Sequence, residues 1–157
     1  MYCYRDDDIN YLTCSDELKR IHEPFRKYNK IHTVACEMYQ LWENKSLFYF
    51  LVSDPLINVE LHGWRHEPYY NWTIENIYED FKRSIEYWDS HTKRLLGIKE
   101  LTPLKTISTW MATWNRSSDN CKTACDKLGL KVNTGENCTW QFHYWSTIPR
   151  EVEEKLQ

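Results

Sequence analysis

The sequence predicts a single α/β domain with a mostly parallel sheet. Its length of 157 residues fits one domain, over residues 1–157, and two only with strain. Segments with strand-like alternation take turns with segments whose apolar residues recur at helical spacing, which is typical of βα units. No internal repeat, linker or low-complexity segment interrupts this order. An open sheet and a small barrel, incomplete or distorted, both fit the pattern.

The first third of the chain is expected to form two βα units. Residues 2–5 alternate aromatic and other side chains, which favours a short strand that ends at three aspartates. Ser15 is the expected N-cap of a helix, since apolar side chains recur at helical spacing up to Phe25. The β-branched run over residues 31–36 predicts the second strand. Residues 37–51 suit a helix, which the following Asp-Pro pair ends.

The middle of the chain is expected to hold a strand, a long helix and another strand. Residues 57–61 alternate in polarity and run directly into a His-Gly-Trp-Arg-His segment. Asn71 or Thr73 caps the long helix, whose apolar side chains recur at spacings of 3, 4 and 7 up to about Ser90. Residues 105–111 predict the fourth strand.

The last third is expected to contain two helices and two short strands. The Ser-Ser-Asp sequence at 117–119 caps a helix that ends at Gly129, the expected C′ glycine. Strands are predicted at 131–132 and 138–144. Pro149, at the first helical position, begins a short final helix.

Composition and charge exclude several classes of protein. The chain has 20 Lys and Arg against 23 Asp and Glu, a net charge of −3, so we do not expect a nucleic-acid partner held by overall positive charge. No apolar run approaches the roughly 18 residues of a membrane span, and an aromatic content of 15% excludes disorder. The first residues lack the apolar core of a secretory signal, so we expect a cytoplasmic protein without a membrane partner.

The chain has six cysteines, namely Cys3, Cys14, Cys36, Cys121, Cys125 and Cys138. Since nothing in the sequence indicates secretion, we expect reduced thiols, most of them buried. The alternative is a structural metal site formed by Cys121, Cys125 and Cys138.

Polar side chains follow several of the predicted strands. The three aspartates at 6–8 follow the first strand, and His62 and His66 follow the third. Residues 113–116 follow the fourth strand, and His143 lies in the last. Active sites of α/β folds gather at the carboxyl ends of the strands. We therefore expect these acids, imidazoles and aromatic side chains to meet at one site.

His62 and His66 have a spacing that suits a metal site. Two neutral imidazoles and one carboxylate form a common catalytic metal centre, with positions left open for water and substrate. Gly63 lets the chain turn, so that both rings can face one point. The alternative is a pair of surface or hydrogen-bonded histidines. Zinc is the default ion for this ligand set, although other divalent metals fit it too.

The three consecutive aspartates predict a divided role. Three buried carboxylates would need a cation, because unpaired buried charge is costly. Neighbours on an extended chain point to opposite sides, so one aspartate can bind the metal while the next acts as a general base toward water. The alternative is a solvated acidic turn. Arg5 is expected to pair with one of the acids, either at the site or as a structural ion pair.

Four short motifs occur in order along the chain: Arg-Asp-Asp-Asp at 5–8, His-Gly-Trp-Arg-His at 62–66, Thr-Trp-Asn-Arg at 113–116 and Gln-Phe-His at 141–143. Their types and order resemble those of the polysaccharide deacetylase (NodB-homology, carbohydrate esterase family 4) superfamily. The resemblance implies a short (β/α) barrel of the polysaccharide deacetylase type. It also implies a hydrolase that uses one divalent metal ion, zinc by default, to remove an acetyl group from an N-acetylated carbohydrate or a small N-acyl substrate.

Carried over residue by residue, the resemblance assigns roles to side chains of this sequence. Asp7 would be the general base and His143 the general acid. The alternative is a register shifted by one, with Asp6 as the base and Asp7 as the ligand. The metal would be bound by Asp8, His62 and His66, and the substrate by Trp64, Trp110, Trp114 and Arg116.

The sequence departs from the family pattern at three places. Ile9 stands where a glycine commonly follows the aspartate pair, Thr113 where a proline is expected, and Gln141 where the last motif has leucine. All the metal-ligand types are kept, so these departures bear on substrate choice more than on metal binding. The alternative function is a non-catalytic carbohydrate- or metal-binding module that retains the deacetylase fold.

Overall fold

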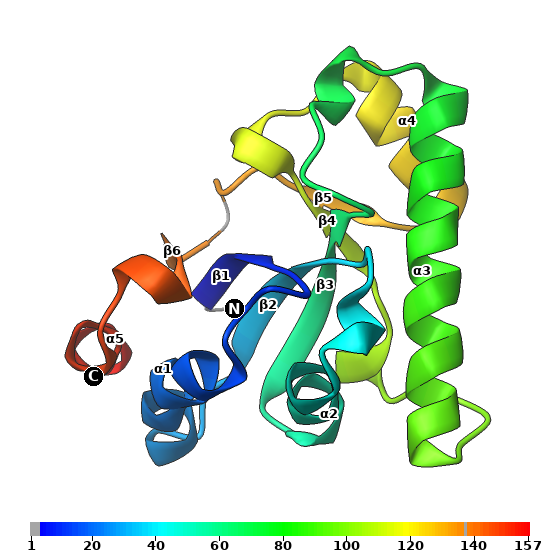
Figure 1. Ribbon diagram of the computed structural model, residues 1–157. Coiled ribbons are helices and arrows are strands. Elements are labelled where there is room, and N and C mark those ends of the chain that lie inside the picture. Colours follow the sequence, from blue (N-terminus) through cyan, green and yellow to red (C-terminus); the bar gives the residue numbers. More distant parts are fainter. Residues whose placement is uncertain (1–3, 137) are drawn as a thin grey trace.

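The chain forms one curled sheet of parallel strands with helices packed around it. The computed structural model describes residues 4–136 and 138–157 (Figure 1). Within these residues, six strands form a sheet in the order β5-β4-β3-β2-β1-β6, and every neighbouring pair is parallel. The predicted α/β class and partial (β/α) barrel are thus confirmed. The strands are β1 (Tyr4–Ile9), β2 (His32–Glu37), β3 (Ile57–Gly63), β4 (Thr109–Met111), β5 (Lys131–Asn133) and β6 (Trp140–Phe142).

Helices connect most successive strands, as expected for a parallel sheet. The α-helices are α1 (Ser15–Lys27), α2 (Lys45–Ser53), α3 (Ile74–Leu96), α4 (Asp119–Leu128) and α5 (Pro149–Leu156). Short 3₁₀ helices are η1 (Leu41–Glu43), η2 (Tyr69–Asn71), η3 (Pro103–Lys105), η4 (Thr113–Asn115) and η5 (Tyr144–Ser146). Among the described residues, no helix is both long enough and apolar enough to cross a bilayer.

The last strand returns to the first. β6 pairs with β1, with Trp140 opposite Tyr4, whereas β5 forms the other edge of the sheet. β5 and β6 follow one another in the sequence but lie at opposite edges, so the barrel is open between them (Figure 1).

The buried apolar side chains of the described residues form two clusters. The larger lies between the sheet and helices α2, α3 and α4 and contains the fully buried Trp88 and Trp110. The smaller joins β1 and β6 to helices α1 and α5, and its buried members are Tyr4, Ile21, Phe25, Phe142, Val152 and Leu156. The C-terminal strand and helix are therefore attached to the domain through their own cluster.

Several predicted helix ends are confirmed. Thr73 is the N-cap of α3 and accepts a hydrogen bond from the backbone N–H of Asn76. Ser118 is the N-cap of α4, and Gly129 ends that helix in the left-handed conformation that favours glycine. At α1 the prediction was wrong: the N-cap is Cys14, without a side-chain hydrogen bond, and Ser15 is already helical.

Several elements differ from their predicted bounds; α3, for example, continues to Leu96 instead of ending near Ser90, and β6 is limited to Trp140–Phe142. β1 runs to Ile9, so the three aspartates belong to the strand instead of following it. The helix predicted at 37–51 begins only at Lys45, because Gln40 turns the chain in a left-handed conformation and Asn44 caps the helix. The strand predicted at 105–111 is reduced to β4, because Lys105 ends η3 and donates to three backbone carbonyls.

Candidate active site

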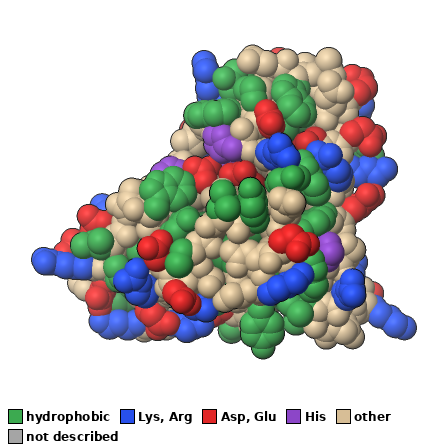
Figure 2. All heavy atoms as spheres, viewed as in Figure 1, with side chains coloured by type: hydrophobic (Ala, Val, Ile, Leu, Met, Phe, Trp, Pro, Cys, Tyr) green, Lys and Arg blue, Asp and Glu red, His purple; other side chains and the backbone are tan. Residues whose placement is uncertain are grey.

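The carboxyl ends of β1 and β3 and the segments around β4 and β6 line one cavity. Its volume is about 390 Å³. Histidine and acidic side chains lie next to one another on the face shown in Figure 2. The sequence predicts a site at this end of the sheet. The lining residues are Asp7, Asp8, His62, His66, Trp114, Asn115, Gln141 and His143.

Asp8, His62 and His66 present one ligand atom each to a common point. These atoms all lie within 4.8 Å of one another, and within the described ranges no other group of three or more such side chains does so. The Oδ1 atom of Asp8 lies 2.9 Å from Nε2 of His62 and 3.3 Å from Nε2 of His66. Cys121 and Cys125 are buried on α4 and form no such group among the described residues, so the cysteine alternative lacks support. Cys3 lies outside the described residues.

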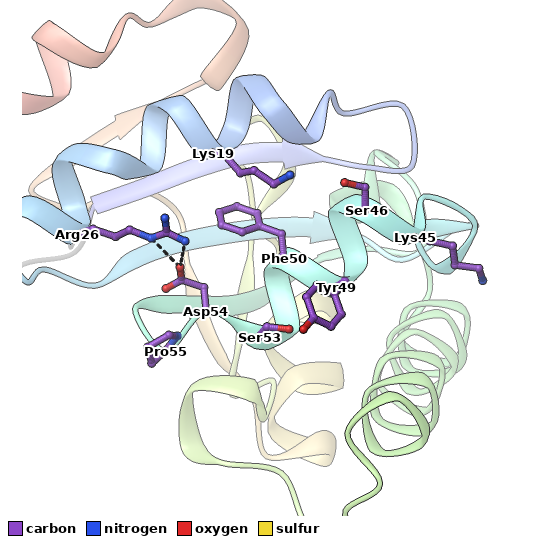
Figure 3. A pocket seen from close by; sticks show the side chains of 9 residues that line it. All are labelled: Lys19, Arg26, Lys45, Ser46, Tyr49, Phe50, Ser53, Asp54 and Pro55. Carbon is purple, nitrogen blue, oxygen red and sulfur yellow. Dashed lines mark hydrogen bonds and ion pairs between the residues drawn. The ribbon is translucent and has the colours of Figure 1, made fainter.

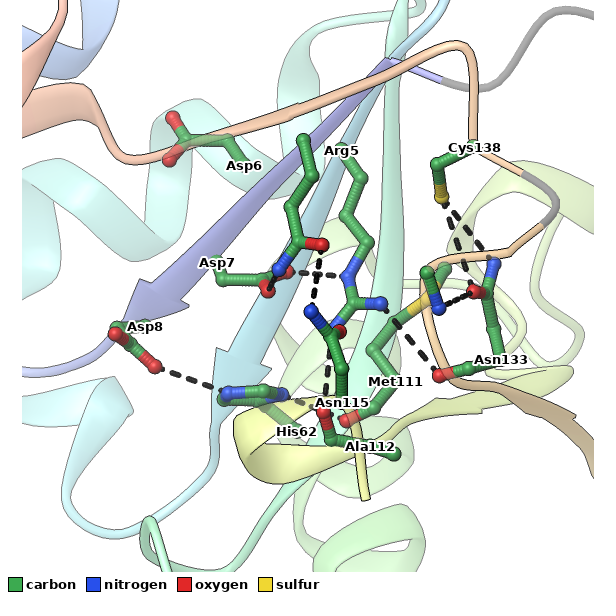
Figure 4. A network of polar contacts seen from close by, with 12 residues as sticks. Arg5, Asp6, Asp7, Asp8, His62, Met111, Ala112, Asn115, Asn133 and Cys138 are labelled. Atoms are coloured by element: carbon green, nitrogen blue, oxygen red, sulfur yellow. Dashed lines mark hydrogen bonds and ion pairs between the residues drawn. The ribbon is translucent and has the colours of Figure 1, made fainter. Parts of the chain in front are cut away.

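The orientation of His62 fits a metal ligand. Its Nδ1 lies 2.7 Å from the carbonyl oxygen of Met111, which can only accept, so Nδ1 carries the hydrogen. In a neutral ring, Nε2 is then the unprotonated nitrogen, and it points at the carboxylate of Asp8 (Figure 4). Two acceptors that face each other need a proton or a cation between them. A divalent ion would satisfy this arrangement, and the carbonyl fixes the required tautomer.

A backbone irregularity brings two neighbouring acids to the same cavity. Between Asp6 and Ile9 the strand β1 advances three residues while β2 advances two, which is a β-bulge. Asp8 has a φ of 60°, in the left-handed region that few non-glycine residues adopt. The expectation that adjacent aspartates point to opposite sides was therefore wrong for Asp7 and Asp8, since both line the cavity.

Gly63 permits the turn that places His62 and His66 together. Its φ is 121°, and a Cβ atom there would collide with the Tyr69 hydroxyl and the Arg65 carbonyl. The two imidazole rings have centroids 5.1 Å apart. The predicted role of this glycine is thus confirmed by the backbone conformation.

The pKa shifts of two of the candidate ligands, Asp8 and His66, are in the direction that suits metal binding. Burial alone would raise the pKa of Asp8, but the neighbouring imidazoles of His62, His66 and His143 bring that pKa below its usual value. Burial, reinforced by His62, lowers the pKa of His66. An ionised carboxylate and a neutral imidazole are the forms that coordinate metals.

Asp7 is held from both sides. Its Oδ1 atom lies 2.5 Å from Nε of Arg5 (Figure 4). Its Oδ2 atom accepts a 2.7 Å hydrogen bond from the Gln141 amide. The fully buried Arg5 also donates to the carbonyl of Ala112 at 3.3 Å. The guanidinium is therefore fixed, and it fixes the carboxylate in turn. The sequence left open which acid Arg5 would pair with.

Asp6 does not reach the cavity. It is fully buried, points away from Asp7 in Figure 4, and its Oδ1 atom accepts a hydrogen bond from the backbone N–H of Tyr144 at 3.0 Å. Burial raises the pKa of Asp6 well above its usual value. The register with Asp6 as base and Asp7 as ligand therefore has no support in the geometry, and Asp7 with Asp8 is the pair that lines the cavity.

His143 lines the same cavity as the three metal-ligand candidates. It follows β6 directly, and its Nδ1 atom lies 3.7 Å from Oδ2 of Asp8. Its ring stacks on Trp145, with centroids 4.5 Å apart and planes 14° from parallel. As expected, Gln141 and His143 share the face toward the cavity, whereas Phe142 packs in the smaller apolar cluster.

The predicted groove residues do not all line the cavity. Trp114 is 54% exposed and lines the cavity, with its ring 4.1 Å from that of His66. Arg116 is exposed and stacks over Tyr70. Trp110 is fully buried against Phe81 in the core, so its prediction as a groove wall was wrong.

Trp64 is also outside the set of residues that line the cavity. It is half-buried between Tyr87 and the guanidinium of Arg83. Asn115 and Gln141 belong to the sequence motifs but have no role predicted from them, yet both line the cavity and hydrogen-bond to each other at 2.9 Å. No periodicity or spacing signal identifies such a contact, because it joins segments that meet only in the folded chain.

Comparison with known proteins identifies the fold. No protein-family model matches this sequence, and no curated protein is significantly similar to it in sequence. Solved structures of family 4 carbohydrate esterases do match the fold. The family 4 carbohydrate esterase from Streptomyces lividans, in complex with acetate, superposes with a TM-score of 0.68 at 14% identity, over 99% of this chain and 86% of that one.

Two further matches cover less of the other chain. A pseudoenzyme of this family from Bacillus anthracis has a TM-score of 0.64 at 15% identity, over 83% of this chain and 42% of that one. A family 4 acetyl xylan esterase from Clostridium thermocellum, in complex with a cobalt ion, has a TM-score of 0.60 at 14% identity, over 83% and 56%. The present chain therefore has the fold of the family 4 carbohydrate esterases and spans about two fifths of the length of the Bacillus anthracis chain.

Proposed function

We propose that this protein is a metal-dependent hydrolase that removes an acetyl group from an N-acetylated carbohydrate or a related small N-acyl substrate. The observation that carries the proposal is the convergence on one cavity of a two-histidine, one-carboxylate cluster, a separately held carboxylate and a third histidine. The fold of the family 4 carbohydrate esterases supports it.

The proposed metal ligands are Asp8, His62 and His66. A divalent ion bound there would polarise the acetyl carbonyl and make a nearby water more acidic. Zinc is the default for this ligand set, while the cobalt complex of the Clostridium thermocellum esterase shows that another ion is accepted by a protein of this fold.

Asp7 is the proposed general base. Its carboxylate lines the cavity, and Arg5 and Gln141 fix both of its oxygens. A fixed carboxylate next to the attacking water can take its proton without first losing rotational freedom. Arg5 is itself buried and makes no part of the cavity wall, so its role is to position Asp7.

His143 is the proposed general acid. Its ring lies at the cavity, on a different segment from Asp7, and stacking on Trp145 restricts its rotation. A protonated imidazole there can give its proton to the leaving nitrogen of an amide. Trp114, exposed beside His66, offers a flat face for the sugar ring.

The test is acetate release by the full chain. The protein is stripped with a chelator, reloaded with zinc or cobalt, and assayed on N-acetylglucosamine oligomers, peptidoglycan fragments and acetylated xylan. We expect metal-dependent acetate release that Asp7→Asn abolishes while the metal is retained. The control Asp119→Asn, an exposed acid on α4, should be fully active.

If the protein is fully loaded with metal and releases acetate from none of these substrates, the proposal that it is an enzyme is contradicted. The specific alternative is a non-catalytic binding module, which the match to a pseudoenzyme of this fold favours. It predicts binding of an acetylated oligosaccharide without turnover, measured by calorimetry on the metal-loaded protein.

A further inference from the structure

A row of buried ionisable side chains, Asp6, His32, His22 and Asp54, lies behind the site and takes no part in the proposed mechanism. Nε2 of His32 lies 3.6 Å from Oδ2 of Asp6, and Nδ1 of His32 lies 3.2 Å from Nδ1 of His22. Nε2 of His22 lies 3.2 Å from Oδ1 of Asp54. Asp6, His32 and His22 are completely buried. This row of side chains thus extends from strand β1, through β2 and α1, to the end of α2.

The two imidazoles are held rigidly between aromatic rings. Phe25 stacks on His32 with a centroid distance of 4.2 Å and nearly parallel planes, and Phe142 lies on His32 at 5.6 Å. His22 stacks on Phe25 as well. Side chains packed this way cannot turn to find other hydrogen-bond partners, and buried polar groups without partners are costly.

Asp54, at the outer end of this row, determines which nitrogen of each imidazole carries the hydrogen. Asp54 is ion-paired with Arg26, whose Nε and Nη2 lie 2.9 and 2.6 Å from Oδ2 (Figure 3). Its carboxylate can only accept, so the neutral ring of His22 is favoured with its hydrogen on Nε2, which lies 3.2 Å from Oδ1 of Asp54 but outside hydrogen-bond geometry, and Nδ1 of His22 is then an acceptor. Nδ1 of His32 then donates to His22. Burial lowers the pKa of His22 to about 4 and that of His32 to about 3, so each ring carries one hydrogen near neutral pH.

Asp6, at the inner end of this row, binds the segment that carries His143. With its hydrogen on Nδ1, His32 places an unprotonated Nε2 3.6 Å from Oδ2 of Asp6, a packing contact longer than a hydrogen bond, and neither atom has a hydrogen-bond partner among the described residues. The other oxygen of Asp6 accepts the 3.0 Å hydrogen bond from the backbone N–H of Tyr144. Tyr144 directly follows His143, so Asp6 holds the backbone next to the proposed acid.

We propose that Asp6 is a positioning residue for His143, and that His32 and His22, anchored by Asp54, fix the Asp6 carboxyl in the orientation that binds the Tyr144 amide. This inference rests on the proposed function for its kinetic consequence. Its structural part, the placement of the His143 segment, stands independently of activity.

The test compares two substitutions of Asp6 that have similar size. Asp6→Asn keeps an acceptor for the Tyr144 N–H and offers an N–H to Nε2 of His32, so we expect near-parent kinetics. Asp6→Leu removes both. We expect it to lower kcat roughly 10- to 100-fold, because a small misplacement of a catalytic group has that cost, while KM and metal affinity stay within twofold. Equal kinetics in the two variants would overturn the proposal.

A second variant keeps the test decisive if Asp6→Leu fails to fold. His32→Phe retains a flat ring between Phe25 and Phe142 but removes both nitrogens, so it interrupts the row of polar side chains next to Asp6. We expect a loss of kcat in the same direction. The control His91→Phe changes a histidine that stacks on Trp42, outside this row, and should leave the kinetics unchanged.

A readout without turnover separates this inference from the proposed function. Trp145 stacks on His143, so the ¹⁹F NMR signal of 5-fluorotryptophan at position 145, assigned with Trp145→Phe, reports the placement of the segment. We expect a shifted or broadened signal in Asp6→Leu and His32→Phe and a parent-like signal in Asp6→Asn. An unchanged signal in folded Asp6→Leu or His32→Phe overturns the positioning role even if no substrate is ever turned over.

Discussion

Arg5 and Asp7 form an ion pair inside the barrel although both come from strand β1. Residues two apart on a strand share a face, so both side chains point to the same side of the sheet. Both are nearly completely inaccessible to solvent. A single strand therefore supplies both the proposed base and the cation that holds it.

Replacing this arginine by lysine tests the positioning of Asp7. Arg5→Lys keeps the positive charge but loses the planar set of donors that reaches Asp7 and the Ala112 carbonyl. We expect kcat to fall roughly tenfold or more with metal content unchanged, measured by steady-state kinetics and metal analysis. The control Arg83→Lys changes a surface arginine paired with Asp80 and should have no effect. Parent kinetics in Arg5→Lys would refute the positioning role.

Metal affinity should depend sharply on His62. His62→Ala leaves two of the three proposed ligands. We expect a loss of affinity larger than the roughly 10- to 100-fold that removal of a supporting hydrogen bond costs at metal sites. Competition with a chromogenic chelator measures it, and His91→Ala serves as the matched histidine control. An unchanged affinity in His62→Ala would rule out this ligand assignment.

The substitution His143→Asn should separate catalysis from folding. Asparagine keeps a polar side chain but cannot transfer a proton as a general acid, so kcat should drop by roughly 10²–10⁴. Melting temperature and metal content should stay at the parent values, because His143 is partly exposed and is not one of the proposed ligands. Turnover at the parent rate in this variant would show that another group is the acid.

Stability should fall as the pH is lowered below neutrality, because of His22 and His32. Both have folded-state pKa values depressed by burial, to about 4 and about 3. Between those values and the unfolded value of about 6.5, the unfolded chain binds more protons than the native one, so the free energy of unfolding rises with pH. The groups that face the two rings are Asp54, Arg26 and Asp6.

The magnitude follows from the same linkage. From about pH 7 to about pH 5, each histidine should cost roughly 1–2 kcal/mol of unfolding free energy. In urea titrations, the double variant His22→Gln/His32→Gln should be less stable at pH 7 but should show a shallower dependence on pH. A slope as steep as that of the parent protein would mean that other groups cause the dependence.

The order of elements could be predicted because it depends on local patterns. Alternating strands and helices, the Thr73 and Ser118 caps and the Gly129 end all follow from short stretches of sequence. The bounds that were wrong depend on tertiary contacts. Lys105, for example, stands where a strand was expected, but its amine binds the carbonyls of Leu51, Asp54 and Ile57.

The candidate site could be predicted in its residue types but not in its geometry. The motifs identified the histidines and acids that line the cavity. The bulge that turns Asp7 and Asp8 to the same side has no local signal, since a left-handed aspartate is stabilised only by its surroundings. Trp110 was misplaced because a tryptophan in a strand looks the same in sequence whether it faces the core or a groove.

The way in which β6 and α5 are attached has a consequence for local unfolding. β6 is hydrogen-bonded along one side only, to β1, and the small cluster shared with α1 and α5 holds it there. Such a unit can detach as a cooperative piece at a lower free energy than global unfolding. Gln141 and His143 would leave with it, whereas Asp8 on β1, His62 on β3 and His66, just after β3, would stay in place. We therefore expect amide hydrogens of 140–156 to exchange before those of β2 and β3, and the detached form to keep the proposed metal ligands while lacking the proposed acid.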